Sequence, residues 1–335
     1  MSVFTPVTVH EAREFVAPYG IGDIIDFQNI AAGVENSNFF VTTTLGRYVL
    51  TIFEKIPRQD LDFYMGLMSH LHGHGIACAA PLAIKTGEVI RTLKDKPAAL
   101  VTRLNGGDIA HPVPKDCHAV GVALARVHKA AGNFALKMPN WRGLSWWRSY
   151  TKELSPLLFP RERDLLETEL KFHAGFDELN LPRGIIHGDL FRDNILWDDH
   201  VDTHVPQMID FYFACEEQLL LDVAITVNDW CVDFSAYPDA RINDANVIAL
   251  LKGYASVRPF TREEREAWPQ MLRAAAMRSW LGRLGYHYFP RDSELTHPKD
   301  HPFSERLLNF HIEHEHENRA QICKYNKGIV VLACR

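Results

Sequence analysis

The sequence lacks the features that mark membrane, secreted or nucleic-acid-binding proteins. Its 335 residues carry a net charge of −6 and no run of lysine or arginine, so a nucleic acid or an anionic membrane is not expected as a partner. No apolar run reaches the roughly 18 residues that a membrane span needs. The first residues contain neither the basic nor the apolar segment of a signal peptide. We therefore expect a cytoplasmic protein.

Metal-binding patterns are also scarce. The six cysteines are scattered without C-x-x-C spacing, so neither a disulfide framework nor a cysteine zinc site is expected. Histidine is more abundant and forms two clusters, at 70–74 and at 311–316. Neither cluster has a third fixed ligand or a cysteine, so we interpret both as exposed helix faces rather than zinc sites.

The central stretch IIHGDLFRDNILWDDHVDTHVPQMIDFYFAC, over 185–215, carries residues suited to phosphoryl transfer. A polar loop after a buried strand holds Asp189 and, five residues later, Asn194, while Asp210 is predicted to end a further strand. Phosphoryl transfer needs a carboxylate that orients the attacking hydroxyl and accepts its proton, and oxygen ligands for Mg²⁺ on the phosphates. Asp189 fits the first role, and Asn194 with Asp210 fits the second.

Aspartate and asparagine also cap ordinary turns, which is the alternative for a lone His-Gly-Asp. The full pattern, H-G-D-x-x-x-x-N followed by apolar-Asp-Phe, is far more specific. Here the chain resembles the aminoglycoside-phosphotransferase-like kinases, and its continuation IDFYFACEEQLLLDVAITVNDWC resembles the homoserine kinases of that group. The resemblance implies an α+β, two-lobe protein-kinase-like fold, with a small antiparallel-sheet N-lobe, a mostly helical C-lobe and ATP in the cleft between them.

Residues 1–104 are predicted to form the lobe that covers the nucleotide. A short helix is expected after Thr8, and a longer one is expected from apolar residues at helical spacing over 61–71. Strands are predicted at 24–31, 38–44, 47–53, 88–92 and 97–103. The linker 105–107, Asn-Gly-Gly, then leads into the catalytic and substrate lobe, over 105–335.

The turn AAGVENSNFFV, between the first two predicted strands, is a candidate nucleotide-covering loop. Gly33 permits close backbone approach, and three polar neighbours offer groups to phosphate oxygens: Asn36, Ser37 and Asn38. Taken alone, the turn is more typical of an ordinary hairpin loop, but its position ahead of the catalytic motif favours the nucleotide role. The resemblance also implies that backbone groups of four residues contact the adenine edge: Leu100, Val101, Thr102 and Arg103.

The chain departs from the wider kinase pattern at one pair of residues. That pattern places a lysine on the third strand, paired with a glutamate on the following helix, to hold the nucleotide phosphates. The aligned positions here are Thr51 and Tyr64. Lys55 is predicted to share the strand face of Thr51 and to supply the missing charge, partnered by an acid in the following helix, with a solvated lysine as an equal alternative.

The remaining candidates lie in the second lobe. Asp222 resembles the aspartate that braces the catalytic loop in the family, and His187 is expected to help hold that loop. Arg192 is a candidate for positive charge near the transferred phosphoryl group, or an exposed arginine. The stretch NWRGLSWWRSY, over 140–150, is expected to pack between the lobes or to line a substrate pocket.

An amino-acid substrate needs a cation for its carboxylate and an acceptor for its ammonium. Arg278 or Arg283, together with Asp229, would supply these groups, and surface positions are the alternative. The resemblance implies the reaction of ATP with L-homoserine to give ADP and O-phospho-L-homoserine, a step toward threonine, with Mg²⁺ as the metal.

Residue chemistry alone does not select homoserine, and two alternatives stay open. The chain could phosphorylate another small alcohol, such as choline, a sugar derivative or an aminoglycoside. It could also be a catalytically silent nucleotide-binding regulator, as the loss of the lysine–glutamate pair suggests. The presence of Asp189, Asn194 and Asp210 together favours an active enzyme, because a silent binder does not need all three.

Overall fold

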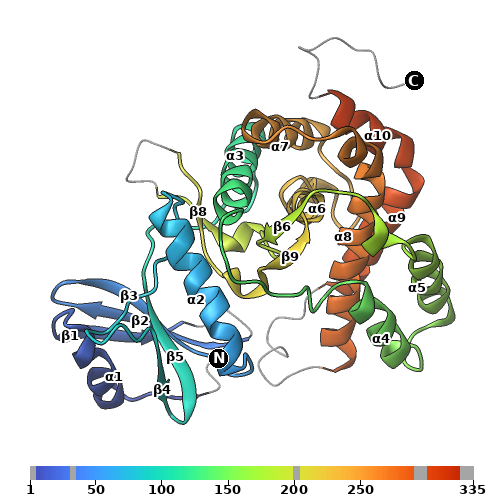
Figure 1. The fold of residues 1–335 in the computed structure, drawn as a ribbon. Coiled ribbons are helices and arrows are strands. Elements are labelled where there is room, and N and C mark those ends of the chain that lie inside the picture. The colour runs from blue at the N-terminus through green and yellow to red at the C-terminus, as the bar shows by residue number, and fades with distance from the viewer. Residues whose placement is uncertain (1–4, 31–34, 199–203, 290–299, 325–335) are drawn as a thin grey trace.

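The computed structural model describes residues 5–30, 35–198, 204–289 and 300–324. An antiparallel sheet with two helices forms one part of the molecule, and helices dominate the other (Figure 1). The predicted α+β, two-lobe kinase-like fold is confirmed. The boundary expected at residues 104–105 stays a prediction. Among the residues that the structure describes, no helix is long and apolar enough to cross a bilayer.

The sheet of the first lobe has five strands in the order β1-β2-β3-β5-β4. All neighbouring strands are antiparallel, and every strand end lies within two residues of its predicted position. The strands are β1 (Ile24–Asn29), β2 (Ser37–Thr43), β3 (Gly46–Ile52), β4 (Ile90–Leu93) and β5 (Lys96–Thr102). Lys94 and Asp95 join the last two with φ angles of 54° and 60°, the left-handed pair that a tight hairpin turn requires.

Two helices of the first lobe pack on different cores. Helix α1 (Val9–Val16) begins at the predicted N-cap Thr8, whose hydroxyl and Glu11 form a capping box, and it buries an apolar face against the sheet. Helix α2 (Arg58–Gly73) instead joins the large apolar core of the helical lobe. Ala99 and Val101 of β5 belong to the same large core, so both α2 and the sheet itself contribute to the packing that joins the two lobes.

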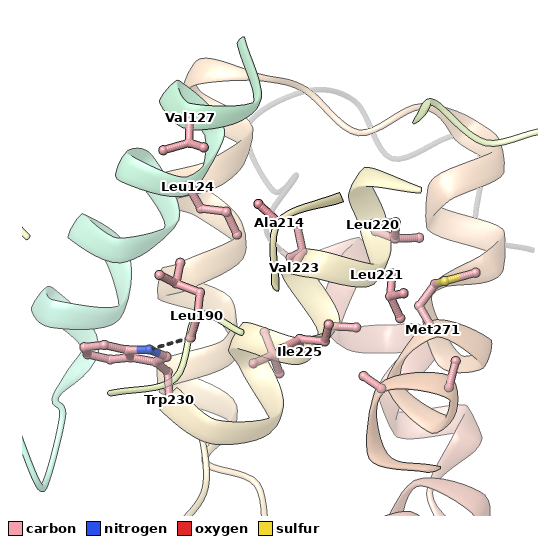
Figure 2. Packing of buried hydrophobic residues seen from close by; sticks show 14 of the residues in the cluster. Leu124, Val127, Leu190, Ala214, Leu220, Leu221, Val223, Ile225, Trp230 and Met271 are labelled. Atoms are coloured by element: carbon pink, nitrogen blue, oxygen red, sulfur yellow. Dashed lines mark hydrogen bonds between the residues drawn. The ribbon is translucent and has the colours of Figure 1, made fainter. Parts of the chain in front are cut away.

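Helix α6 (Leu219–Trp230) is the centre of the helical lobe, surrounded by α3, α7 and α8 (Figure 1). Every residue in it except Asp229 is buried, as expected for a helix that is apolar on all sides. Figure 2 shows its side chains between Leu124 of α3 and Met271 of α8. The other helices are α3 (Pro114–Ala131), α4 (Leu144–Leu154), α5 (Pro160–Phe172), α7 (Asp244–Val257), α8 (Arg262–Tyr288), α9 (His301–Glu313) and α10 (Glu315–Lys324).

Two short strand pairs frame the central motif. Strand β6 (Arg183–Ile186) pairs with β9 (Cys215–Gln218), and β7 (Ile195–Leu196) pairs with β8 (Gln207–Met208). The motif thus begins at the end of β6 and folds back on itself through the β7–β8 hairpin. This arrangement brings the loop after β6 next to the segment after β8.

The close contact of α3 with α7 depends on two glycines. A Cβ on Gly121 would lie 2.1 Å from the carbonyl oxygen of Leu250, and a Cβ on Gly253 would lie 2.1 Å from that of His118. Both neighbours are backbone atoms, so relief would require the helices to move apart. Sequence periodicity does not reveal this requirement.

We predict that Gly121→Ala destabilises the protein by about 1–3 kcal/mol, the usual cost of overpacking, despite the better helix propensity of alanine. The control is Gly73→Ala at the end of α2, where a Cβ would have no atom within 4 Å. Chemical denaturation should separate the two variants. Equal stabilities would show that the helices adjust without cost.

Candidate active site

Asp222, in the first turn of α6, holds the start of the catalytic loop. Its carboxylate is fully buried and accepts hydrogen bonds from the backbone amides of His187 (2.7 Å) and Gly188 (2.9 Å). These two residues directly follow β6 and precede Asp189. The bracing position expected for Asp222 is confirmed.

A second buried side chain, His128 of α3, completes this support. Its Nε2 lies 3.0 Å from the Asp222 carboxylate, and its Nδ1 lies 2.8 Å from the hydroxyl of Tyr254 in α7. Burial opposes ionisation of Asp222, but the hydrogen bond and positive potential of His128, with the amide of Gly188, hold its pKa below the usual value. Sequence reasoning treats His128 as structural but does not find its partner, which is distant in the chain.

His187 ties the catalytic loop to the segment before Asp210. Its Nε2 lies 3.0 Å from the carbonyl of Ile209, and its Nδ1 lies 3.3 Å from the backbone nitrogen of Asp189. Because a carbonyl only accepts, Nε2 carries the hydrogen and Nδ1 accepts from the amide. Burial lowers the pKa of His187, which favours this neutral form. Both ring nitrogens are therefore used in positioning.

Asp189 and Asn194 lie in one compact turn. The side-chain amide of Asn194 donates to the backbone carbonyl of Asp189 at 2.7 Å and lies 3.3 Å from its carboxylate. The indole of Trp230 donates to the carbonyl of Leu190 at 3.2 Å, as the dashed line in Figure 2 shows. The turn is thus held by its own asparagine and by the end of α6.

Asp210 lies beside this turn. The amide of Ile209 donates to the carbonyl of Asn194 at 3.1 Å, which places Asp210 next to the asparagine. The prediction that Asp210 ends a strand is wrong: β8 stops at Met208, and Asp210 adopts the left-handed conformation (φ 60°, ψ 61°). This conformation is uncommon for a residue other than glycine and turns the chain sharply at the site.

The electrostatics around Asp210 suit a bound cation. The residue keeps an exposed surface, but desolvation of its carboxyl by the surrounding protein, and then the negative charges of Asp189 and Glu35, raise its pKa to about 7. A divalent ion would favour the ionised form, and carboxylate and amide oxygens are its preferred ligands. Among the described residues no group of three or more His, Cys, Asp or Glu side chains is placed to hold a metal ion by itself, so phosphate and water oxygens would complete the shell. Asp210 and Asn194 fit such a metal.

The usual lysine–glutamate pair is replaced by a neutral cluster. The hydroxyl of Thr51 donates to the side-chain oxygen of Asn38 at 2.8 Å, and Tyr64 packs edge-on against Tyr212, with 5.9 Å between ring centres. The prediction that Lys55 shares the strand face of Thr51 is wrong, because β3 ends at Ile52 and Lys55 is exposed beyond it. The alternation of strand side chains therefore says nothing about where Lys55 points.

The candidate covering loop is only partly described, and Gly33 lies outside the described residues. Asn36 is buried. Ser37 is fully buried, donates to Glu54 at 2.6 Å and accepts from the amide of Thr5 at 3.0 Å. These contacts, like that between Asn38 and Thr51, hold the sheet together. A nucleotide role for the loop stays a prediction. Because Ser37 and Asn38 are engaged within the sheet, Asn36 and backbone amides would be the groups that contact phosphate.

The backbone groups expected to contact the adenine edge are also largely engaged within the protein. The carbonyl of Leu100 accepts from the amide of Leu82 at 2.8 Å, and the amides of Thr102 and Arg103 donate to protein carbonyls at 2.9 and 3.0 Å. Val101 also forms a bridge, on the side away from β3. Residues 100–102 are therefore paired on both sides, so we expect the adenine edge to meet the chain after the amide of Arg103.

The three substrate candidates line one cavity of about 230 Å³ beside the catalytic loop. Arg278 donates to the carbonyl of Gly188 at 2.7 Å, and Arg283 donates to that of Asp300 at 3.2 Å. Asp229 accepts from both the amide (2.8 Å) and the Nε (3.0 Å) of Arg192. The cavity thus combines the buried cation Arg278 with the half-buried Arg283 and Asp229, the pairing of charges that a zwitterion requires.

Arg192 is only 20% exposed, so the alternative of an exposed arginine is wrong, while its expected charge near the transferred phosphoryl group stays a prediction. Its guanidinium pairs with Asp229 and stacks over Phe234, 3.9 Å from the ring centre, so it belongs to the wall of the cavity. Sequence reasoning also misses Asp300 and Tyr237, whose hydroxyl donates to Asp300 at 2.8 Å. No local pattern relates these two residues, because they are 63 positions apart.

The expected exposure of the second histidine cluster is wrong for His311. This residue is fully buried, and its Nε2 lies 2.8 Å from the side-chain oxygen of Asn228, another residue of the cavity wall. Burial lowers its pKa to about 3, so it is neutral near pH 7. His311 orients the wall of the cavity.

The comparisons with known proteins agree with this geometry. The phosphotransferase enzyme family model matches residues 26–260. Two similar proteins are homoserine kinases: that of Methylobacillus flagellatus is 44% identical over 93% of this chain and 96% of its own length, and that of Burkholderia lata is 44% identical over 94% and 96%. The chain therefore belongs to the phosphotransferase enzyme family and, within it, to the homoserine kinases.

Solved structures support the fold. The amicoumacin kinase hAmiN, in complex with AMP-PNP, Ca²⁺ and Ami, has a TM-score of 0.68 at 16% identity, covering 92% of this chain and 95% of that one. A microcompartment-associated aminopropanol kinase has a TM-score of 0.64 at 17% identity, covering 93% and 99%. The resemblance stated from the sequence is thus confirmed.

Proposed function

We propose that this chain transfers the γ-phosphoryl group of ATP to the side-chain hydroxyl of L-homoserine, giving ADP and O-phospho-L-homoserine. The observation that carries this proposal is 44% identity to homoserine kinases over nearly the whole chain, with Asp189, Asn194 and Asp210 in one site. The expected cytoplasmic location belongs to the proposal, because the reaction consumes ATP.

In the proposed mechanism, Asp189 accepts a hydrogen bond from the homoserine hydroxyl and takes its proton as the oxygen attacks phosphorus. Mg²⁺, held by Asn194 and Asp210, would neutralise charge on the phosphate oxygens when bound. His187 and Asp222 keep the loop geometry through the contacts described above. Neither of these two exchanges a proton in the reaction.

The cavity beside the loop supports a small amino acid as substrate. Its volume of about 230 Å³ lies below the roughly 300–1,000 Å³ of pockets for drug-sized ligands, which argues against an aminoglycoside. Arg278 and Arg283 would hold the carboxylate of homoserine, and Asp229 would accept from its ammonium. Choline carries no carboxylate and would leave both arginines without an anion.

The test is Mg²⁺-dependent ADP release with L-homoserine beside D-homoserine, L-serine, L-threonine, choline and an aminoglycoside. We expect kcat/KM for L-homoserine to exceed that for each of the others by at least about 100-fold, since the site pairs with polar groups that the others lack or misplace. Preference for another alcohol would overturn the substrate assignment. ATP binding without any turnover would favour the silent regulator.

A further inference from the structure

Arg142, just before α4, has an unusual environment for an arginine. Its guanidinium lies over three aromatic rings, with ring centres 4.5 Å away for Phe213, 4.7 Å for Trp141 and 5.5 Å for Trp146. The side chain is only 14% exposed. Its buried Nε has no hydrogen-bond partner in the part of the chain that the structure describes. A largely buried guanidinium that donates no short hydrogen bond to an anion is costly, so this position favours binding of an anionic ligand.

The aromatic contacts place Arg142 beside the catalytic loop. Phe213, whose ring lies under the guanidinium, also packs against the catalytic loop. A Cβ on Gly188, the residue directly before Asp189, would lie only 2.7 Å from the carbonyl oxygen of Phe213. On the other side, a Cβ on Gly282 would lie 3.5 Å from Nη1 of Arg142. Gly282 is one helical turn from Arg278, so Arg142 packs against the face of α8 that carries Arg278.

Arg142 also reaches the first lobe. Its Nη2 lies 3.9 Å from a carboxylate oxygen of Glu35 and 3.5 Å from the hydroxyl of Tyr286, which itself donates to Glu35 at 3.3 Å. Glu35 is the described residue that directly follows the candidate covering-loop segment 31–34. The ion pair is longer than a hydrogen bond, so a better anion could replace Glu35 as the partner of Arg142.

On this basis, and resting on the proposed function, we propose that Arg142 binds the γ-phosphoryl group of ATP and adds positive charge to a site without the strand lysine, which in other kinases pairs with the α- and β-phosphates. Thr51 and Tyr64, at the positions of the usual lysine and glutamate, are neutral, so the positive charge near the phosphates must come from another residue. The Pγ–O bond to ADP breaks and a Pγ–O bond to homoserine forms. The hydroxyl proton passes to Asp189, and Arg142 stays protonated and donates hydrogen bonds throughout.

Two observations favour a phosphate over the substrate carboxylate as the ligand. Arg142 does not line the cavity that contains Arg278, Arg283 and Asp229. Its guanidinium lies instead beside Glu35, which directly follows the candidate covering-loop segment in the sequence. Burial, and then repulsion from Arg142, lower the pKa of Arg278. Two cations this close to each other fit a site in which each binds a different anion.

The test compares Arg142→Gln and Arg142→Lys with Arg148→Gln. Arg148 is an exposed arginine of α4 that donates to the carbonyl of Ala174 at 3.1 Å, outside the site. We expect Arg142→Gln to weaken ATP binding about tenfold, to leave ADP binding unchanged, and to lower kcat about 100-fold with little change in the KM of L-homoserine. Arg142→Lys should recover part of kcat, and Arg148→Gln should match the wild type.

Equal effects on ATP and ADP, or a higher KM for L-homoserine with normal kcat, would overturn the proposal. The second result would move Arg142 to the substrate carboxylate, and 3-aminopropan-1-ol, which lacks that group, would then be insensitive to the substitution. Should Arg142→Gln fail to fold, Glu35→Gln tests the same pairing, because removing the competing carboxylate should tighten ATP binding; weaker binding would contradict it.

The nucleotide titrations also separate this inference from the proposed function. Arg142-dependent preference for ATP over ADP in a protein that does not phosphorylate homoserine would sustain the inference and refute the proposed substrate. Normal homoserine turnover in Arg142→Gln would refute the inference alone.

Discussion

Asp189→Ala is expected to lower kcat by about 10²–10⁴-fold, the contribution of a positioned general base, while ATP binding stays close to that of the wild type. The fold of the loop should survive, because the closer contact of Asn194 is to the backbone carbonyl of Asp189 (2.7 Å) rather than to its carboxylate (3.3 Å). Coupled ADP release would give kcat, and titration with a fluorescent ATP analogue would give affinity.

Asp193→Ala provides the matched control for Asp189→Ala. Asp193 lies in the same turn, Arg192–Asn194, and is exposed. The control removes the same charge from the same loop, so kcat should change by no more than a few-fold. Near wild-type turnover in Asp189→Ala, or an equal loss in both variants, would refute the role assigned to the Asp189 carboxylate.

Asp222→Ala is expected to cost about 3–5 kcal/mol of stability, as for other buried polar pairs that lose one partner, and to remove nearly all activity. The substitution leaves the amides of His187 and Gly188 and the imidazole of His128 without their buried acceptor. Chemical denaturation at neutral pH would measure the free energy of unfolding.

The pH dependence of this loss has a defined sign. Because the pKa of Asp222 is lowered in the folded protein, its ionised form stabilises the fold above the ordinary aspartate pKa, and that contribution is lost as the pH falls through the folded value. The difference between wild type and Asp222→Ala should therefore shrink on acidification. A difference independent of pH would mean that packing, not charge, is what Asp222 supplies.

Tyr254→Phe is the milder control for the same network. It removes the hydroxyl that contacts Nδ1 of His128 and accepts from Arg258 at 3.3 Å, and it leaves the bonds from Asp222 to the loop in place. We expect a cost of about 0.5–1.5 kcal/mol with activity retained. A loss as large as that of Asp222→Ala would show that the network acts through His128.

The elements that the sequence predicts well are those specified by local patterns. The five strands follow from short apolar runs between turn residues, and α2 and α3 follow from helical spacing. The proximity of Asp189 and Asn194 is also predictable, because they are only five residues apart in one polar loop. The long-range pairing of Asp189 with Asp210 comes from the family resemblance, not from spacing.

The failed or incomplete predictions concern side chains whose partners are distant in the sequence. Arg192 binds Asp229, 37 residues away, and His311 contacts Asn228, 83 residues away. Packing in three dimensions decides these pairs, and polarity along the chain carries no signal for them. The environment of Arg142 likewise combines aromatic rings from its own segment with Phe213, Tyr286 and Glu35, which three other segments supply.

The most direct test of the central claim is phosphorus NMR of a reaction containing the protein, ATP, Mg²⁺ and L-homoserine. The account predicts one new phosphomonoester signal that grows in step with ADP, coincides with authentic O-phospho-L-homoserine and is absent without the amino acid. Accumulation of inorganic phosphate alone, or no consumption of ATP, would contradict the claim that this chain phosphorylates homoserine.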